Sequence, residues 1–222
     1  MSTPQRIRIG MLGGSFDPPH LAHHDLAKVA IKTLGLNALH VVPTGQAWHK
    51  TRQLSDAQHR LAMTRIAFAD LSGVVIDDCE ITRGGDSYTC DTLDALQARY
   101  AVPGGPSAPH ESDPELVLVV GWDQLTRFTT WHQWQNIARR VVLAVAYRCD
   151  AADSADATDA LPDLAPWQHL GLNVVLLPMR PVSISSTYVR DHVSDAPPLD
   201  AWREQVSPEV AHYILQHNLY QT

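Results

Sequence analysis

The feature of this sequence that most constrains its fold is the alternation of short apolar runs with segments of helical period. The apolar runs have the length of strands, are rich in Val, Ile and Leu, and are nearly continuous in their hydrophobicity. A strand of that kind is buried on both faces, as it is in a parallel sheet that helices cover on each side. The sequence therefore predicts a doubly wound α/β domain with a parallel sheet.

Six strands and five longer helices are expected in one Rossmann-like domain that spans residues 1–222 and ends in a short helical C-terminal part, residues 183–222. The strands are placed at Arg6–Leu12, Ala38–Pro43, Val74–Cys79, Glu115–Val120, Arg140–Ala146 and Val174–Leu177. The helices are placed at about His20–Leu34, Asp56–Ala69 (with Ser55 as N-cap), Tyr88–Tyr100, Ser185–His192 and Pro208–Asn218. Residues 103–114 and 150–163 are predicted from their composition to be surface insertions.

Composition narrows the class of function. A net charge of -7 argues against broad nucleic-acid binding, and 45% hydrophobic with 18% charged residues is typical of a globular protein without a membrane span. The first twelve residues lack the basic segment and long apolar core of a signal peptide. The three cysteines are odd in number, far apart and without a CxxC pair, which argues against a disulfide framework or a zinc knuckle. A cytoplasmic location is expected.

The segment after the first strand carries the strongest functional signal. Residues 13–23 read Gly-Gly-Ser-Phe-Asp-Pro-Pro-His-Leu-Ala-His and stand where an open parallel sheet binds ligands. The two glycines allow a close backbone approach to a phosphate, and His20 and His23 are spaced to lie on one face of the following helix, near its N-terminus. A zinc site is a weaker alternative, because no third ligand stands at metal-site spacing. Asp17 is expected to hold the loop's backbone or to contact a ribose.

A second motif lies far downstream, after the last strand. Ser185, Ser186 and Thr187 begin a predicted helix, and Arg190 follows one turn later. Hydroxyl side chains at a helix start indicate a cap. The arginine beside that helix start suits an anion as well.

Together these motifs resemble those of the HxGH nucleotidyltransferases, which transfer adenylyl groups without a covalent intermediate. Residues 13–23 resemble the signature GG(T/S)FDPxHxGH, with Ala22 where the family usually has Gly, and residues 184–190 resemble the second motif, ISSTxIR. The resemblance implies that His20 and His23 are the catalytic residues and contact the triphosphate, with His23 nearest the reacting phosphoryl group. The implied ATP-binding residues are Gly13, Gly14, Ser15, Phe16, His20, His23, Ser185, Ser186, Thr187 and Arg190.

The middle of the chain resembles the bacterial nicotinate mononucleotide adenylyltransferases. Residues 87–93 resemble their SYT-x-x-TL element, residues 121–125 and 130–134 their G-x-D-x-L and TW segments, and residues 43–50 a stretch ending in His-Lys. N–H groups where Tyr88/Thr89 and Trp131/His132 are expected to begin helices could bind the nicotinate carboxylate, and the Trp131 ring could stack on the pyridinium. The candidate acceptor residues are His49, Lys50, Tyr88, Thr89, Asp123, Trp131 and His132.

The resemblance implies adenylyl transfer from ATP to nicotinate mononucleotide, which gives deamido-NAD and pyrophosphate. Mg²⁺ is expected to arrive with ATP, and no protein ligand for it is nominated. The expected partners are these two nucleotides, without nucleic acid or membrane. Nicotinamide mononucleotide or phosphopantetheine as acceptor, or a module that binds nucleotide without turnover, are the alternatives. A Rossmann dehydrogenase is disfavoured, because the first strand is not followed by GxGxxG.

Overall fold

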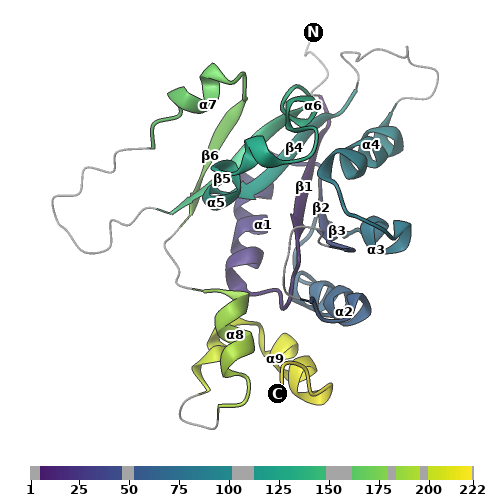
Figure 1. The fold of residues 1–222 in the computed structure, drawn as a ribbon, viewed down its shortest axis with the longest axis vertical. Helices are drawn as coiled ribbons and strands as arrows, with labels where there is room; N and C mark the ends of the chain where they lie inside the picture. Colours follow the sequence, from purple (N-terminus) through teal and green to yellow (C-terminus); the bar gives the residue numbers. More distant parts are fainter. Residues whose placement is uncertain are drawn as a thin grey trace, which may run out of the picture. The chain divides into compact units, whose positions relative to one another are not determined.

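The computed structural model describes residues 6–46, 53–101, 113–148, 162–179, 184–195 and 200–221. Its strands form one six-stranded sheet in the order β3-β2-β1-β4-β5-β6 (Figure 1). The pairs β1–β4, β4–β5 and β5–β6 are parallel. The chain builds outward from β1 to β3 and then returns to build β4 to β6 on the other side, so the topological switch point lies between β1 and β4. The predicted Rossmann-like α/β class is confirmed.

The strands follow the apolar runs to within two residues at each end, except for the end of β3. Their bounds are β1 Arg8–Gly14, β2 Ala38–Pro43, β3 Val74–Ile76, β4 Glu115–Gly121, β5 Val141–Arg148 and β6 Val174–Met179. The expected continuation of β3 to Cys79 is wrong. The carboxylate of Asp77 accepts a hydrogen bond from the Cys79 N–H at 3.1 Å, and this local turn directs the chain into a helix instead.

The five longer predicted helices are present, and several short ones accompany them. The bounds are α1 Leu21–Leu34, α2 Ala57–Ala67, α3 Cys79–Arg83, α4 Thr89–Tyr100, α5 Trp122–Leu125, α6 Trp134–Ala138, α7 Ala165–His169, α8 Ser186–His192 and α9 Pro208–Gln216, with 3₁₀ turns η1 Phe128–Thr130 and η2 Ala201–Gln205. The N-cap of α2 is Asp56, whose Oδ1 accepts from the Gln58 N–H at 2.7 Å, and not Ser55 as predicted. Within the described residues, every helix is too short or too polar to cross a membrane.

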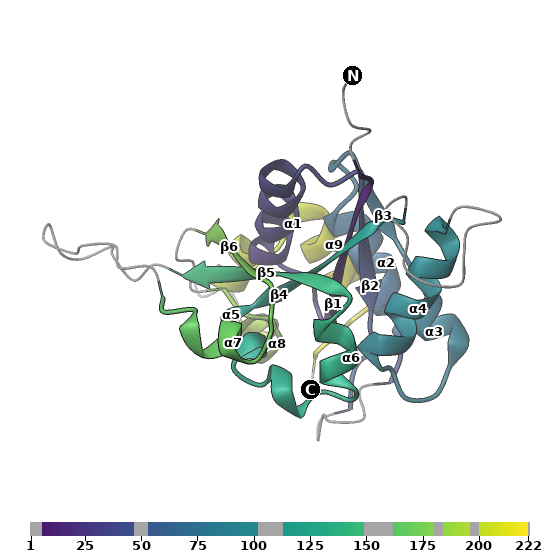
Figure 2. The same cartoon turned by 90° about the horizontal axis from the view of Figure 1, so that it is seen from above.

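Two compact units can be distinguished along the chain, and each is described by itself. The first comprises Met1–Leu12, Val29–His40 and Tyr88–Pro181. Strand β4 is its most buried element, with five consecutive buried residues, Leu116–Val120. Helices cover both faces of the strands in this unit. The C-terminal part of α1 lies on one face, and α4 and α6 lie on the other (Figure 2). This burial on two faces explains the continuous hydrophobicity of the strand sequences.

The second unit comprises Gly13–Lys28, Val41–Ser87 and Val182–Thr222. Its core is a cluster that α2, α8, η2 and α9 build around the fully buried ring of Trp202, with Met63, Val189, Val210 and Ile214 packed against it. Helices α2 and α9 lie side by side (Figure 1). The cluster buries one face of α8 and so fixes the helix that carries the second motif.

The two predicted insertions fall almost wholly outside the described residues. Only the last two residues of 103–114 and the last two of 150–163 are described. The two units are groups of segments that contact one another more than they contact the rest of the chain, and this division does not show whether they fold separately. The expectation of a single folding domain over residues 1–222 stays a prediction.

Candidate active site

The first signature begins inside β1 and not after it. The strand was expected to end at Leu12, but it continues through Gly13 and Gly14. The Gly14 carbonyl accepts hydrogen bonds from the N–H and the Oγ1 of Thr44, at 2.8 and 3.1 Å, which continue the ladder beyond β2. A Cβ on Gly14 would lie 3.0 to 3.2 Å from the ring of Phe16. The second glycine therefore lets the buried Phe16 ring lie close against the backbone, and a Cβ there would press on the ring.

His20, the residue before α1, and His23 lie close together, as their spacing predicts, and their rings are stacked. The ring centroids are 3.6 Å apart and the planes are inclined by 18°. The backbone N–H of His20 donates to Nδ1 of His23 at 3.2 Å, so that Nδ1 acts as an acceptor. In a neutral ring this hydrogen bond assigns the proton to Nε2. The edge of the Phe16 ring packs against the His23 ring, with centroids 5.1 Å apart.

The second motif is hydrogen-bonded to the first. Ser186 Oγ donates to the carbonyl of Pro18 at 2.8 Å, across 168 positions of the sequence. The Arg190 Nη1 donates to the carbonyl of Asp17 at 2.6 Å, and its Nη2 donates to Thr187 Oγ1 at 3.0 Å. Ser185 caps α8 as predicted, because its hydroxyl accepts from the Tyr188 N–H. Ser186 and Arg190 therefore hold the backbone of the first signature loop.

Asp17 serves the loop structurally. Its side chain is buried, and the residue is 1% exposed. Oδ2 accepts from the Ser55 N–H at 3.3 Å, and Oδ1 accepts from the hydroxyl of Tyr220 at 2.8 Å. Of the two roles expected for Asp17, these contacts favour holding the backbone over contact with a ribose.

Sequence reasoning missed Arg60, which organises the same loop. Arg60 is 1% exposed, and its guanidinium donates to the carbonyls of Ser55, Ser15 and Gly45 at 2.9, 3.0 and 3.2 Å. The available signal was its place on the apolar face of α2, beside the buried Leu61 and Met63. An arginine on a buried helix face must satisfy its donors within the protein, and carbonyls of neighbouring loops are its natural acceptors.

The candidate acceptor residues that the structure describes lie in the first unit. Tyr88 is the N-cap of α4 and Thr89 is its first residue, as expected. The ring of Tyr88 packs against the exposed ring of His132, with centroids 4.5 Å apart and planes inclined by 38°. Two elements that are 44 positions apart thus present adjacent rings. Two further candidates, His49 and Lys50, lie outside the described residues.

The expectation that Trp131 and His132 begin a helix is wrong. Trp131 ends the turn η1, and its N–H donates to the Phe128 carbonyl at 3.0 Å. The next helix, α6, begins at Trp134, with Gln133 as its N-cap in the left-handed region at φ 54°. No helix begins at Trp131, and the Trp131 N–H already donates to Phe128. The helix N-terminus that was expected to bind the carboxylate at this position is therefore absent.

The tryptophans of this segment pack around one buried ring. The centroid of Trp131 lies 5.4 Å from that of the buried Phe128, and the centroid of Trp134 lies 6.3 Å from it in an edge-to-face arrangement. For Trp134 this is the packing role that its sequence context predicts. Trp131 is only half-buried, so that stacking on a ligand ring stays a prediction for it.

Asp123 stands at the carboxyl end of β4, in the first turn of α5. Its Oδ2 accepts from Gln124 Nε2 at 2.7 Å. A Cβ on Gly121 would lie 2.6 Å from its Oδ1, so the glycine leaves room for the carboxylate. The ends of parallel strands near the switch point are where open α/β sheets bind ligands, and this position suits a contact with a nucleotide.

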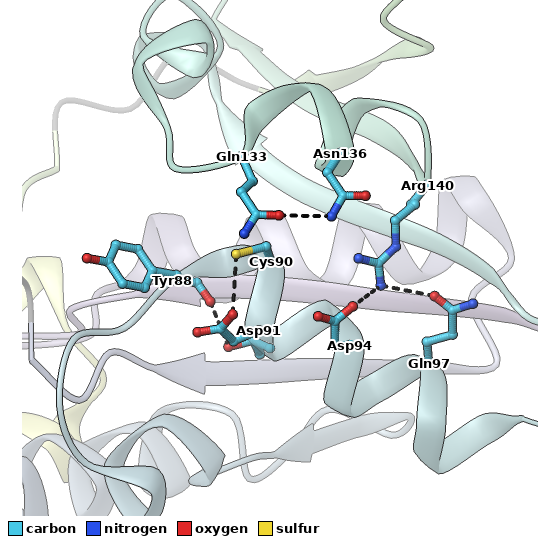
Figure 3. A network of polar contacts seen from close by, with 9 residues as sticks. Tyr88, Cys90, Asp91, Asp94, Gln97, Gln133, Asn136 and Arg140 are labelled. Atoms are coloured by element: carbon cyan, nitrogen blue, oxygen red, sulfur yellow. Dashed lines mark hydrogen bonds and ion pairs between the residues drawn. The ribbon is translucent and has the colours of Figure 1, made fainter.

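A polar network holds the two acceptor elements together (Figure 3). Arg140, which follows α6, forms an ion pair with Asp94 at 2.6 Å and donates to Gln97 Oε1 at 3.0 Å, and both partners lie on α4. Asn136 of α6 donates to Gln133 Oε1 at 3.1 Å. The Arg140 contacts therefore tie α4, which begins just after Tyr88, to the end of the segment that carries His132, and the Asn136–Gln133 bond lies within that segment.

Several histidines outside the motifs were predicted to be surface or packing residues, and three described ones fit that prediction. His40 is buried and bonds Tyr100, and His59 bonds Tyr213. His24 bonds the exposed carboxylate of Asp70 at 3.0 Å. That hydrogen bond is the main cause that lowers the pKa of Asp70 from its ordinary value.

Comparisons with known proteins show the family of the chain and agree with its fold. The model of a family described as cytidylyltransferase-like matches residues 11–192. A probable nicotinate-nucleotide adenylyltransferase of Albidiferax ferrireducens is 42% identical over 219 residues, covering 97% of this chain and 98% of the relative. One of Methylibium petroleiphilum with the same description is 38% identical, covering 99% and 94%. The solved Plasmodium falciparum nicotinic acid mononucleotide adenylyltransferase complexed with NaAD has a similar fold, with a TM-score of 0.75 at 19% identity, covering 97% and 98%.

Proposed function

The chain belongs to the cytidylyltransferase-like family and, within it, to the nicotinate-nucleotide adenylyltransferases, and we propose that it transfers the adenylyl group of ATP to nicotinate mononucleotide. A phosphate oxygen of the acceptor attacks the α-phosphorus in line. The new P–O bond joins the two nucleotides, the bond between the α- and β-phosphates breaks, and pyrophosphate leaves with the electron pair. The product is deamido-NAD, so the activity belongs to NAD biosynthesis.

The observation that carries the proposal is the direct hydrogen bonding of the two motifs. Ser186 and Arg190 hold the carbonyls of Pro18 and Asp17, immediately before the stacked pair His20 and His23. This arrangement gathers imidazole, hydroxyl and guanidinium groups in one place. Such a set of donors suits a triphosphate, whose oxygens accept charge-assisted hydrogen bonds.

Catalysis is assigned to positioning and charge stabilisation. The attacking phosphate is already ionised at neutral pH, so the reaction needs no strong general base. With Nδ1 accepting from the His20 N–H, the neutral His23 ring carries its donor proton on Nε2. That donor would stabilise the negative charge that develops on the transferring phosphoryl group.

Recognition of the acceptor nucleotide is assigned to three places: the residues just after the C-terminal end of β4, the N-terminus of α4, and the turn before α6. The N–H groups of Thr89 and Cys90 at the start of α4, where the N-cap Tyr88 makes no side-chain cap hydrogen bond, would bind the nicotinate carboxylate. Trp131 would stack on the pyridinium, with His132 and Asp123 as further contacts. His49 and Lys50 are proposed to contact phosphate. A carboxylate accepts at both oxygens whereas an amide offers one acceptor, so we propose a preference for the acid.

Mg²⁺ is proposed to enter with ATP and to be held mainly by phosphate oxygens and water. Among the described residues, no group of three His, Cys, Asp or Glu side chains is arranged to hold a metal ion. A cytoplasmic location is proposed from the number and spacing of the cysteines.

The test is pyrophosphate release from ATP and Mg²⁺ with three acceptors: nicotinate mononucleotide, its amide, and phosphopantetheine. We expect a kcat/KM for the acid at least about a hundredfold above that for the amide, because unpaired buried donors penalise the wrong ligand. Equal use of acid and amide would keep adenylyl transfer but refute the role given to the start of α4. Release of no pyrophosphate with any acceptor would instead support a module that binds nucleotide without turnover.

A further inference from the structure

The loop between Phe16 and His20 has few backbone donors. Pro18 and Pro19 carry no N–H, so this stretch is anchored chiefly through its acceptors. Two of them, the carbonyls of Asp17 and Pro18, accept from Arg190 and Ser186. A further anchor is the buried carboxylate of Asp17, so the groups that hold this carboxylate help to set the position of the loop.

One donor to this carboxylate comes from the far end of the described chain. Tyr220 donates its hydroxyl proton to Asp17 Oδ1 at 2.8 Å, across 203 positions of the sequence. The other carboxylate oxygen accepts from the Ser55 N–H at 3.3 Å. Asp17 is 1% exposed, so loss of either donor would remove a hydrogen bond from a desolvated carboxylate.

Tyr220 is held in an unusual conformation for a bulky residue. Its φ is 63°, in the left-handed region that side chains other than glycine rarely adopt. The ring packs against the core cluster around Trp202, and the Leu219 N–H before it donates to the Ile214 carbonyl at 3.0 Å. Backbone strain of this kind persists where surrounding contacts over-determine it, which makes the hydroxyl contact a candidate for function.

The hydroxyl of Tyr220 remains a donor throughout the pH range in which an enzyme works. Burial and, next, the negative charge of Asp17 raise its pKa well above the ordinary value. The hydroxyl therefore keeps its proton near neutral pH.

We propose that Tyr220 is a positioning residue for adenylyl transfer: its hydroxyl fixes the Asp17 carboxylate and thereby the loop that presents His20 and His23. The inference rests on the proposed function for its kinetic consequence. Tyr220 acts through Asp17 and is not assigned a contact with either substrate.

The test compares Tyr220→Phe with Tyr213→Phe. Tyr213 is a matched control, because it lies in the same C-terminal segment and its hydroxyl bonds His59 and not the loop. We expect Tyr220→Phe to lower kcat about tenfold or more while the KM for ATP stays within about threefold, since a misplaced catalytic group weakens the transition state more than ground-state binding. Tyr213→Phe is expected to keep kcat within about threefold of the parent value.

A second readout does not depend on turnover. The Ser55 amide donates to the same carboxylate, so its hydrogen exchange should quicken about tenfold in Tyr220→Phe and stay unchanged in Tyr213→Phe. A Tyr220→Phe protein with parental kcat and parental exchange at Ser55 would overturn the proposal. So would equal losses in both variants, which would indicate general loosening. If the parent protein uses none of the three acceptors, the proposed function fails and the exchange of Ser55 alone decides whether Tyr220 holds the loop.

Discussion

The guanidinium of Arg190 donates to the backbone carbonyl of Asp17 at 2.6 Å while it also donates to Thr187 Oγ1 at 3.0 Å. One side chain therefore spans the two motifs that sequence reasoning had assigned separately to ATP. This double engagement uses the planar fork of arginine, which places two donors at fixed directions. Replacements at this residue should expose both its structural and its proposed phosphate-binding roles.

Arg190→Lys is predicted to lower kcat/KM for ATP about a hundredfold, because one ammonium group cannot reproduce the two directed donors and still meet a phosphate. The measurement is steady-state pyrophosphate release at varied ATP. Arg203→Lys is the control, since the Arg203 side chain is 47% exposed and pairs with Asp200. Equal kcat/KM values for the Arg190→Lys protein and the parent would contradict the role given to Arg190.

His23→Ala is predicted to lose most turnover, about a hundredfold or more in kcat, and to keep its fold, because the His23 ring is proposed to stabilise the transferring phosphoryl group. The adjacent His24→Ala is the matched control. His24 bonds the exposed Asp70 instead, so its kcat should stay within about threefold of the parent value. Far-UV circular dichroism would check the fold of both variants. An active His23→Ala protein would remove the proposed catalytic role.

Gly121→Ala is predicted to raise the KM for nicotinate mononucleotide about tenfold with little loss of stability. The added Cβ would stand 2.6 Å from Asp123 Oδ1, and the short side chain can move aside only by leaving its present position. The φ of Gly121 is -79°, so alanine adopts this backbone without strain.

A double-mutant cycle isolates the cause of that effect. In Asp123→Ala the carboxylate is absent, so adding Gly121→Ala should change the KM for the acceptor no further. Independent, additive effects of the two substitutions would show that Gly121→Ala acts through something other than Asp123.

The thiol of Cys79 is predicted to react slowly with alkylating reagents in the folded protein. Burial and then the negative charge of Asp77 raise the pKa of Cys79 to about 12. Only about one ten-thousandth of such a thiol is ionised at pH 8, and the thiolate is the reactive form. In a Cys149→Ser background, labelling of folded Cys79 should quicken about tenfold for each pH unit between pH 7 and 10. A plateau near pH 9, as expected of the denatured chain, would contradict the raised pKa.

Much of the fold could be predicted from the sequence, because parallel strands buried on two faces leave unbroken apolar runs. Strand β2 has the bounds that its run of Val and Leu predicts, and α8 begins where Ser185 provides a cap. The short elements were harder. Helix α6 has only five residues, too few to show a helical hydrophobic period, and its N-cap is Gln133 in the left-handed region, which is not a typical cap. Its predicted start is therefore too early in the sequence.

The site divides in the same way. Glycines, histidines and hydroxyls in a fixed local pattern identified the two motifs, and the proximity of His20 and His23 follows from their spacing. Arg60 and Tyr220 were missed because their partners, Ser15 and Asp17, lie 45 and 203 positions away. Contacts at such separations have no periodicity that a single sequence could show.

The three carbonyls that Arg60 holds belong to segments at Ser15, Gly45 and Ser55, which are distant from one another in sequence but share one buried cation. If any of these segments moved away, a donor of the buried guanidinium would lose its acceptor in the protein interior. The first signature loop should consequently not open on its own, without movement of the other two segments. Its fluctuations are coupled to those of helix α2, so that disturbing any one of the three segments lowers the resistance of all three to proteolysis and exchange by a similar amount.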